Sequence, residues 1–412
     1  MDREEALAWL DGLGAGRIEL GLSRISALLD RLGRPDRAYP ALHVAGTNGK
    51  GSTCAMAAAT LQAAGLRVGL YTSPHLVDFE ERIAIGGTPI TADALATAAT
   101  AVRNAAEGIP LTYFEAGTAV ALHAFRQVRV DVAVLETGLG GRLDATNAVT
   151  PAACAITTLG LDHVELLGPT LAHVAGEKAG ILKPGVPCVA AASAPEAIAT
   201  VERKAREVGS PLLVEGQDFT FAERTYRGPR WTVSGVQLAL RGPHQLHNAA
   251  VAIALLEASG LPVGPGAVRA GLSGVRWPGR LEAIERPEAT VVLDGAHNPQ
   301  GAEALAAALR ALWPGKQPVF VFGVLADKDA GSMMAALFPL AARVVLVPPR
   351  SPRARAPETL AEAARPFCRQ VVTLPALASA LADALARPGA DRLVVVCGSL
   401  YLLGEARGRL LH

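Results

Sequence analysis

Apolar runs of strand length alternate with alanine-rich helical stretches along the first part of the chain. The runs cover residues 41–45, 66–71, 131–135 and 152–157, and residues 52–64 have the composition of a helix that ends at Gly65. Nearly every position in these runs is apolar, which is typical of strands buried on both faces of a parallel sheet. The pattern therefore predicts an α/β domain with a mostly parallel sheet and helices on both sides of it.

The pattern changes twice further along the chain. Short alternating segments in residues 211–240 predict a small antiparallel excursion, and a helix is expected at residues 247–258. The stretch 276–287 is rich in proline and arginine, as linkers often are. Beyond it the α/β alternation restarts, with strand-like runs at residues 290–293, 319–324, 344–347 and 393–396. We expect two domains, residues 1–285 and a smaller, Rossmann-like α/β domain at residues 286–412.

Composition places the chain among soluble proteins with a large core. Half of the 412 residues are hydrophobic, and 39 Lys and Arg nearly balance 38 Asp and Glu, so we expect neither a nucleic-acid partner nor a membrane partner. The N-terminus has acids where a signal peptide has basic and apolar regions. Five scattered cysteines without a C-x-x-C pair favour a reducing compartment over a disulfide framework or a zinc site. A cytoplasmic location is expected.

The glycine-rich segment at residues 46–52 lies between a predicted strand and a predicted helix. Its glycines let backbone N–H groups surround phosphate oxygens, its lysine reaches the β- and γ-phosphates, and its hydroxyl can hold Mg²⁺. It differs from the common P-loop because Val44 replaces the first glycine and Gly51 separates Lys50 from Ser52. The alternative is an ordinary glycine-rich turn, but the strand, lysine and helix together favour a nucleotide site in a P-loop-containing domain.

Polar side chains follow three more predicted strands of the first domain. Ser73 comes after the second strand, Glu136 ends the third, and His163 follows the fourth. The carboxyl edge of an open α/β sheet is where ligands bind, and a carboxylate close to a P-loop suits phosphate-bound Mg²⁺. Taken singly, these residues also fit a turn, a solvated strand end and a loop histidine. Together on one edge they favour a metal site.

Two further segments carry candidate chemistry. Glu177 and Lys178, near a predicted helix end, fit a surface ion pair by default. In the second domain a strand leads into the segment 294–299, where Asn298 and Pro299 suit a helix start. Capping explains neither Asp294 nor His297, so we expect a site there.

With these residues assembled, the chain resembles the bacterial dihydrofolate synthase/folylpolyglutamate synthase group of the Mur-ligase superfamily. The resemblance runs from about residue 21 to residue 399 and includes the form of the P-loop noted above. The motifs that carry it are residues 46–52, 72–75, 136–147, 162–163, 177–181, 244–249, 278–280 and 294–299.

The resemblance implies an ATP-binding Mur-ligase central domain at residues 1–285, a C-terminal glutamate-ligase domain at 286–412, and a role for each matching residue. The implied ATP contacts are Thr47, Asn48, Gly49, Lys50, Gly51, Ser52, Asn248, Arg280 and Asp294. Implied metal ligands are Ser73, Glu136, His163 and, if carbamylated, Lys178, which overrides the surface-pair interpretation. Implied catalytic residues are Lys50, Lys178 and His297. Substrate contacts would come from Gly21, Leu22, Ser23, Phe114, Glu115, Thr118, Arg142, Leu143, Asp144 and Ser399.

The implied reaction is ATP-dependent addition of L-glutamate to folate, and to dihydropteroate, through an acyl phosphate. ATP and two Mg²⁺ ions are the expected cofactors, and closure of the second domain is expected to exclude water. We expect a monomer with small-molecule partners only. A muramoyl-peptide ligase of the same superfamily is less favoured because only about 45 residues precede Gly46. The other alternative is an ATP-binding switch that ligates nothing, which would not respond to glutamate.

Overall fold

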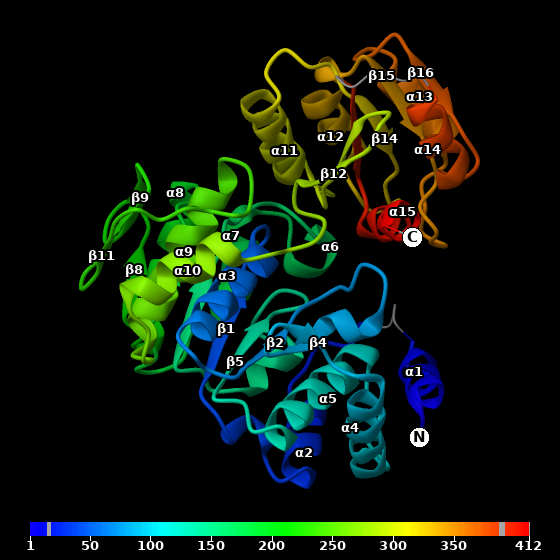
Figure 1. Ribbon diagram of the computed structural model, residues 1–412. Helices are drawn as coiled ribbons and strands as arrows, with labels where there is room; N and C mark the ends of the chain where they lie inside the picture. Colours follow the sequence, from blue (N-terminus) through cyan, green and yellow to red (C-terminus); the bar gives the residue numbers. More distant parts are fainter. Residues whose placement is uncertain (15–17, 387–391, 412) are drawn as a thin grey trace. The chain divides into compact units, whose positions relative to one another are not determined.

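The computed structural model describes residues 1–14, 18–386 and 392–411 and divides them into two compact units (Figure 1). The first comprises Met1–Ala239 and Leu246–Val275, and the second comprises Leu240–Gln245 and Arg276–His412. The expected boundary after residue 285 falls ten residues beyond this division. The difference arises because β12 (Glu282–Glu285), in the proline- and arginine-rich stretch interpreted as a linker, pairs with the next strand, β13 (Thr290–Leu293).

The first unit is built on a mostly parallel sheet of the order β4-β3-β2-β5-β1-β6-β7-β8. Its strands are β1 (Ala41–Ala45), β2 (Val68–Tyr71), β3 (Ile83–Ile85), β4 (Thr88–Pro89), β5 (Val132–Glu136), β6 (Ala153–Ile156), β7 (Cys188–Ala190) and β8 (Leu212–Val214). The strands from β2 to β8 in that order run parallel, as the apolar runs predict, and β3 and β4 add an antiparallel edge that the pattern did not reveal.

The antiparallel excursion is smaller than expected. Residues 212–214 form β8, which pairs in parallel with β7 and so extends the large sheet. The separate antiparallel sheet contains β9 (Thr220–Ala222), β10 (Thr225–Arg227) and β11 (Thr232–Val233). Buried Glu257 holds this sheet, because its carboxylate accepts hydrogen bonds from the Tyr226 hydroxyl at 2.6 Å and from the Trp231 backbone N–H at 2.5 Å.

The helices α3 and α5 pack on strands of this sheet, and α4 lies beside α5 in Figure 1. The α-helices are α1 (Arg3–Gly12), α2 (Ser23–Arg31), α3 (Lys50–Ala63), α4 (Ala92–Ala105), α5 (Tyr113–Gln127), α6 (Val164–Leu167), α7 (Leu171–Lys178), α8 (Pro195–Val208), α9 (His244–Ser259) and α10 (Pro265–Gly274). Short 3₁₀ turns are η1 (Pro35–Arg37), η2 (Phe79–Arg82), η3 (Ala145–Ala148) and η4 (Ala179–Ile181).

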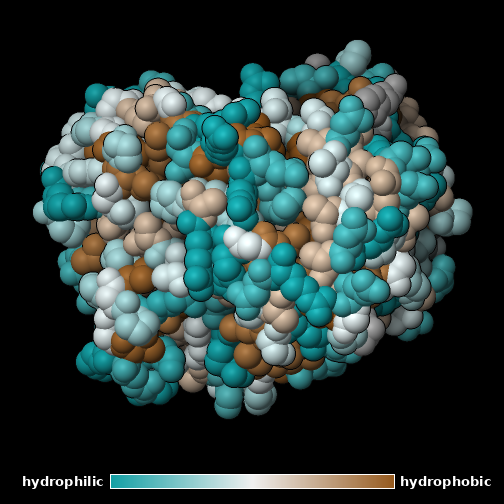
Figure 2. Space-filling view, turned by 90° about the horizontal axis from the view of Figure 1, so that it is seen from below, coloured by the Kyte–Doolittle hydropathy of each residue, from teal (hydrophilic) through white to brown (hydrophobic). Residues whose placement is uncertain are grey.

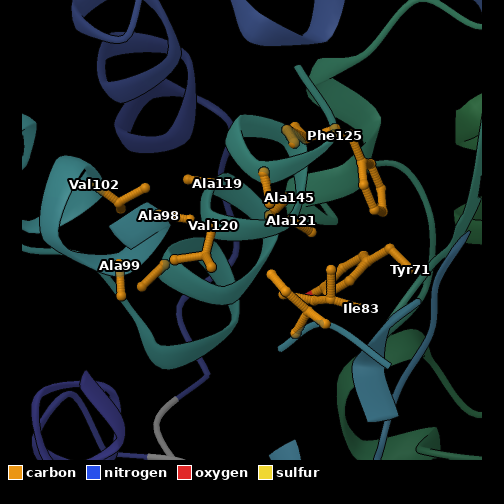
Figure 3. Packing of buried hydrophobic residues seen from close by; sticks show 14 of the residues in the cluster. Tyr71, Ile83, Ala98, Ala99, Val102, Ala119, Val120, Ala121, Phe125 and Ala145 are labelled. Atoms are coloured by element: carbon orange, nitrogen blue, oxygen red, sulfur yellow. The ribbon is translucent and has the colours of Figure 1, made fainter. Parts of the chain in front are cut away.

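A hydrophobic core fills the space between β2, β3 and α5 (Figure 3). Tyr71, Ile83 and Phe125 are buried there. A Cβ at Gly69 would lie 2.7 Å from the Phe125 ring, so only glycine at this strand position lets the ring reach the sheet. This packing fixes β2, and therefore the loop that carries Ser73 beyond its end.

The second unit repeats the α/β plan on a smaller scale. Its sheet has the order β12-β13-β17-β14-β15-β16, and all neighbours except β12 and β13 are parallel. Its remaining strands are β14 (Val319–Phe322), β15 (Arg343–Leu346), β16 (Val371–Thr373) and β17 (Leu393–Cys397). Its helices are α11 (Pro299–Leu312), α12 (Ala330–Leu337), α13 (Pro357–Ala364), α14 (Leu377–Leu385) and α15 (Leu400–Leu411), with a 3₁₀ turn η5 (Phe338–Leu340).

Within the described residues, we find no helix that combines the length and the apolar character needed to cross a bilayer. On the face in Figure 2, hydrophobic side chains lie in small groups between hydrophilic ones. All five cysteines are buried with free thiols.

Candidate active site

The glycine-rich segment joins β1 to α3, as the sequence predicts. Gly49 has φ +89° and stands immediately before Lys50, the first residue of α3. The first amides of a helix have no carbonyl partner in their own helix, so the turn at residues 50–52 presents N–H groups and a partial positive charge to an anion. The local fold is therefore a phosphate-binding turn.

The two residues after Gly46 form hydrogen bonds with the loop that follows β6. The backbone N–H groups of Thr47 and Asn48 donate to the Thr158 carbonyl at 3.0 and 3.2 Å, and the Thr47 hydroxyl donates to the Gly160 carbonyl at 2.9 Å. These groups hold the position of the loop.

Asn248 lies directly against the phosphate-binding turn. A Cβ on Gly49 would come within 2.2 Å of the Asn248 Oδ1 atom, so the amide side chain packs closely against the backbone at Gly49. Asn248 is buried, on α9. The fold thus brings two segments that are 199 residues apart in sequence into direct contact.

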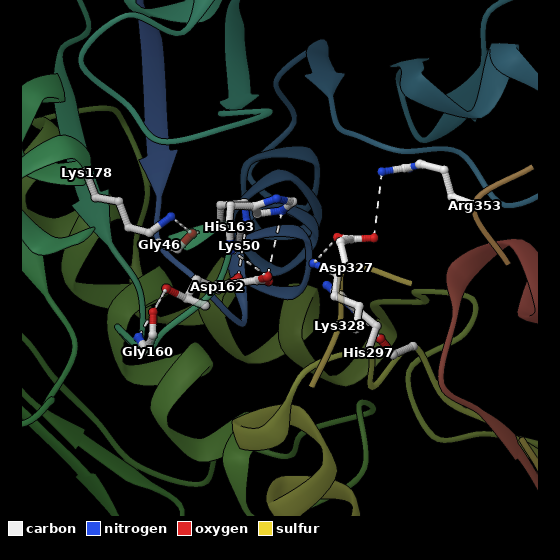
Figure 4. A network of polar contacts seen from close by, with 12 residues as sticks. Gly46, Lys50, Gly160, Asp162, His163, Lys178, His297, Asp327, Lys328 and Arg353 are labelled. Carbon is white, nitrogen blue, oxygen red and sulfur yellow. Dashed lines mark hydrogen bonds and ion pairs between the residues drawn. The ribbon is translucent and has the colours of Figure 1, made fainter. Parts of the chain in front are cut away.

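Two lysines converge on one carbonyl oxygen of this turn (Figure 4). Lys50 Nζ donates to the Gly46 carbonyl at 3.1 Å and Lys178 Nζ donates to the same oxygen at 2.8 Å. Burial and, to a smaller extent, the positive charge of Lys50 together lower the pKa of Lys178 to about 7, although the charges of Asp162 and Asp144 oppose the shift. A substantial fraction of Lys178 is therefore a neutral amine at neutral pH.

The surface ion pair between Glu177 and Lys178 that the sequence favoured by default does not form. Glu177 accepts hydrogen bonds from the Arg142 guanidinium at 2.9 and 3.1 Å, while Lys178 is buried. The reason is helical geometry, because adjacent residues of α7 point in different directions.

The structure brings two of the three proposed metal ligands together. The Ser73 backbone N–H donates to Glu136 Oε2 at 3.1 Å, and Glu136 is buried at the carboxyl end of β5. His163 has a left-handed backbone, with φ +50°, and its Nε2 atom lies 3.9 Å from Asp162 Oδ1. Strained backbone of this kind is concentrated at functional sites.

These side chains suit Mg²⁺ better than a metal ion that takes all of its ligands from the protein. Among the residues that the structure describes, no group of three or more His, Cys, Asp or Glu side chains is close enough to hold a metal ion. Mg²⁺ is usually bound by one or two carboxylates together with water and substrate phosphates. Glu136 and the Ser73 hydroxyl beside a phosphate-binding turn meet that description.

Three stretches proposed to bind the substrate are neighbours in the first unit. The helix α2, which begins at Ser23, packs against α5 and η3, and α5 also packs against η3. Phe114 tilts against Tyr71 with 6.0 Å between ring centroids. The fold thus gathers Gly21, Leu22 and Ser23 with Phe114 and the stretch 142–144.

Several of these polar side chains are bonded within the protein. Buried Asp144 accepts hydrogen bonds from the backbone N–H groups of Gly138 and Leu139, both at 2.9 Å, and burial raises its pKa. Glu115 forms a capping box with Thr112 and accepts from Arg24 Nε at 3.1 Å. These contacts position the loop after β5 and the start of α5.

Thr118 is buried and donates its hydroxyl hydrogen to the Phe114 carbonyl at 2.8 Å. Leu143 lies half-buried between exposed Arg142 and buried Asp144. The hydrogen bond from Thr118 holds the backbone at Phe114, and so fixes where the Phe114 ring lies.

In the second unit, the candidate residues follow strands of its sheet. Buried Asp294, after β13, accepts from the backbone N–H groups of Leu281 and Ala296 at 3.0 and 2.9 Å, and burial raises its pKa although the charges of Arg280 and His244 oppose the rise. A Cβ on Gly295 would lie 2.7 Å from Arg280 Nη1. Arg280 and Asp294 are therefore neighbours, as the proposed nucleotide contacts require.

Two residues of the segment 294–299 begin a helix, and His297 lies just before them. Asn298 caps α11, accepting from the Gly301 N–H at 2.8 Å, and Pro299 is the first helical residue, so the capping interpretation is correct. The His297 ring nitrogen Nδ1 lies 2.7 Å from the Gly295 carbonyl. Ser399, which follows β17, is buried.

The sequence reasoning missed Lys328, which also follows a strand of this sheet. It comes after β14, is buried, and its Nζ lies 3.5 Å from Asp327 Oδ2. Because β14 and β13 both pair with β17, Lys328, His297 and Ser399 follow three adjacent strands. Polar residues that follow a parallel strand are candidates for ligand binding, and this criterion, applied to the segment after residue 322, would have identified Lys328.

Comparison with known proteins places these features in one family. The Mur ligase middle domain model matches residues 44–256, and the Mur ligase, glutamate ligase domain model matches residues 279–400. The folylpolyglutamate synthase of Lacticaseibacillus casei is 40% identical, over 94% of this chain and 94% of that protein.

Solved structures agree along the whole chain. Escherichia coli FolC in complex with DHPP and ADP has a TM-score of 0.92 and 34% identity, and covers 100% of this chain and 98% of that one. A bifunctional folylpolyglutamate synthase/dihydrofolate synthase with Mn, AMPPNP and L-glutamate bound has a TM-score of 0.90 and 34% identity, with 99% of this chain and 98% of that chain covered.

Proposed function

We infer the function of this chain from its place in a family: it belongs to the folylpolyglutamate synthases of the Mur ligase family and is an ATP-dependent ligase that adds L-glutamate to folates. Its cofactors are ATP and a divalent metal ion. The proposal extends to dihydropteroate as a second acceptor and to the residues that carry the reaction.

The observation that carries the residue assignments is the pair of lysines on the Gly46 carbonyl. Lys50 Nζ at 3.1 Å and Lys178 Nζ at 2.8 Å bring two amines to the phosphate-binding turn. A turn that only binds a nucleotide would need Lys50 but not Lys178. The second amine, buried and with a lowered pKa, is suited to react with CO₂ and become an anion.

The reaction needs activation because a carboxylate has a poor leaving group. An oxygen of the folate carboxylate attacks the γ-phosphorus of ATP, and ADP leaves. The glutamate amine then attacks the acyl carbon, phosphate leaves, and the nitrogen loses a proton. Lys50 and the N–H groups at the start of α3 stabilise the negative charge that spreads over the transferred phosphoryl group.

A divalent metal ion at this turn neutralises phosphate charge and orients the phosphoryl group. Ser73, Glu136 and His163 would hold it, and carbamylated Lys178 would supply an anionic oxygen to a second ion. The contact between the Ser73 N–H and Glu136 keeps the carboxylate oriented. Arg280, Asp294 and Asn248 bind the nucleotide, and His297 and Ser399 contribute from the second unit.

The small-molecule substrates need no other partner. We propose that the chain acts as a monomer without nucleic acid, in keeping with its near-zero net charge. We propose a cytoplasmic location, which the five buried free thiols support.

Phosphate release from Mg-ATP and L-glutamate tests the function, with tetrahydrofolate and dihydropteroate as acceptors in parallel. Release with both acceptors supports the bifunctional enzyme, and release with tetrahydrofolate alone restricts it to polyglutamylation. An ATPase rate that does not respond to glutamate or to either acceptor would contradict the proposal.

A further inference from the structure

A buried arginine at the end of η2 has no carboxylate partner. Arg82 is only 9% exposed, and its Nε donates to His75 Nδ1 at 2.8 Å. Within the described part of the chain, no ion pair involves its guanidinium. Buried arginines are normally paired, because an uncompensated charge is costly to remove from water.

The missing partner is not explained by a shortage of acidic residues. Glu80 pairs with Arg3, and Asp78 lies 3.8 Å from the same guanidinium. Glu81 accepts hydrogen bonds from backbone N–H groups of its own loop. The three acidic side chains of this segment thus contact other groups, and none of them pairs with the Arg82 guanidinium.

The residues around Arg82 leave its two Nη atoms available to donate hydrogen bonds to a ligand. The guanidinium carbon lies 5.6 Å from the Phe79 ring centroid and 5.3 Å from that of Tyr113. The Nδ1 atom of His75 accepts the hydrogen bond from Arg82 Nε, so His75 contacts the guanidinium as an acceptor and not as a carboxylate would, with a negative charge. Neither Nη atom donates a hydrogen bond in the described structure, and neither is among the side-chain nitrogens shut off from solvent.

Arg82 connects two parts of the proposed site. Its backbone carbonyl accepts from the Thr72 N–H at 2.9 Å, beside the Ser73 that contacts Glu136. Tyr113, on its other side, is followed by Phe114 of the proposed folate-binding surface. Arg82 therefore contacts both the segment that leads to Ser73 and the residue that precedes Phe114.

We propose that Arg82 binds the α-carboxylate of the terminal glutamate of folate, the carboxylate that does not react. This inference rests on the proposed function. A planar guanidinium matches a carboxylate with two parallel hydrogen bonds. Binding the reacting carboxylate would stabilise its charge and make its oxygen a weaker nucleophile, so the guanidinium suits the spectator group. Dihydropteroate has no such group, which makes Arg82 a specificity-determining residue.

The test compares acceptors with and without the α-carboxylate. Steady-state kinetics would use tetrahydrofolate, dihydropteroate and tetrahydropteroyl-4-aminobutyrate, which keeps the γ-carboxylate and lacks the α-carboxylate. Arg82→Met, which preserves the hydrocarbon packing, is expected to raise the KM for tetrahydrofolate by about tenfold to a hundredfold. The KM for the other two acceptors should change by less than about twofold, so the preference for tetrahydrofolate over the aminobutyrate analogue is lost.

Arg3→Met serves as the matched control, since it loosens the same loop by releasing Glu80 but leaves the proposed receptor in place. It should keep the wild-type preference. An equal loss with all three acceptors in Arg82→Met, at unchanged affinity for ATP, would overturn the inference in favour of a structural role.

The remaining outcomes are also distinguishable. If Arg82→Met does not bind ATP, Arg82→Lys carries the test, because it keeps the charge and loses the paired geometry; it should show a smaller rise confined to tetrahydrofolate, and an equal loss with all acceptors would again overturn the inference. A wild-type enzyme that is inactive with every acceptor would contradict the proposed function itself.

Discussion

Asn248 Oδ1 would lie 2.2 Å from a Cβ placed on Gly49. The contact joins α9 to the phosphate-binding turn, and it leaves no room for any side chain at position 49. The backbone there also adopts φ +89°, which L-residues other than glycine rarely accept.

Gly49→Ala is therefore expected to abolish nucleotide binding, because the methyl group must displace either the turn or Asn248. Isothermal titration with ADP measures the loss. Gly65→Ala is the matched control: its φ is +87°, but an added Cβ meets no described atom within 4 Å. That control should cost about 1–2 kcal/mol of stability and keep ADP affinity. Equal ADP affinity in both variants would show that the contact is dispensable.

Lys50→Ala should reduce kcat by about a hundredfold or more while the fold is retained, because a positioned charge at the transferred phosphoryl group is lost. Turnover is followed by phosphate release, and the fold by circular dichroism. Lys204→Ala removes a partly exposed lysine paired with Glu207 and should leave kcat unchanged. Wild-type turnover in Lys50→Ala would contradict the phosphate-binding assignment.

Glu136→Gln should sharply increase the Mg²⁺ concentration needed for half-maximal activity, since a neutral amide is a weaker ligand for a hard cation. A Mg²⁺ titration at saturating ATP provides the measurement. Glu196→Gln, an exposed position on α8, is the control. If both titrations coincide with wild type, Glu136 is not a ligand.

Lys178 should give folding stability a distinctive pH dependence in CO₂-free buffer. Its pKa is about 7 in the folded chain against 10.5 for an ordinary lysine, so between these pH values the unfolded chain binds more protons. The free energy of unfolding should then rise with pH across this window, by at most about 1.4 kcal/mol per pH unit. Denaturant titrations at several pH values measure the slope, and Lys178→Met should flatten it.

The same lysine should react with CO₂ when bicarbonate is added. The neutral amine is the nucleophile, so carbamate formation should increase as pH rises through 7. Carbon-13 NMR with labelled bicarbonate should show one carbamate signal that Lys178→Met lacks. A signal that persists in Lys178→Met would assign the modification to another amine.

The sequence determined the α/β class, the strand runs and the phosphate-binding turn, because these depend on local patterns. Continuous apolar runs of strand length favour strands buried on both faces, and a glycine-rich turn between a strand and a helix favours an anion site at the helix start. Capping by Asn298 with Pro299 is similarly local, and the structure confirms it. The rule that polar residues follow parallel strands also located Glu136 and Asp294.

Only the tertiary structure decided which distant groups meet. The short strand β12 has four residues in a proline- and arginine-rich stretch, and pairing with β13 makes it a strand. Lys178 looks like a surface residue in sequence, and burial beside Lys50 lowers its pKa. Arg82 lies in a segment with several charged residues, yet packing against Phe79 and Tyr113 buries it. Burial and charge environment depend on contacts between remote segments, which no local pattern encodes.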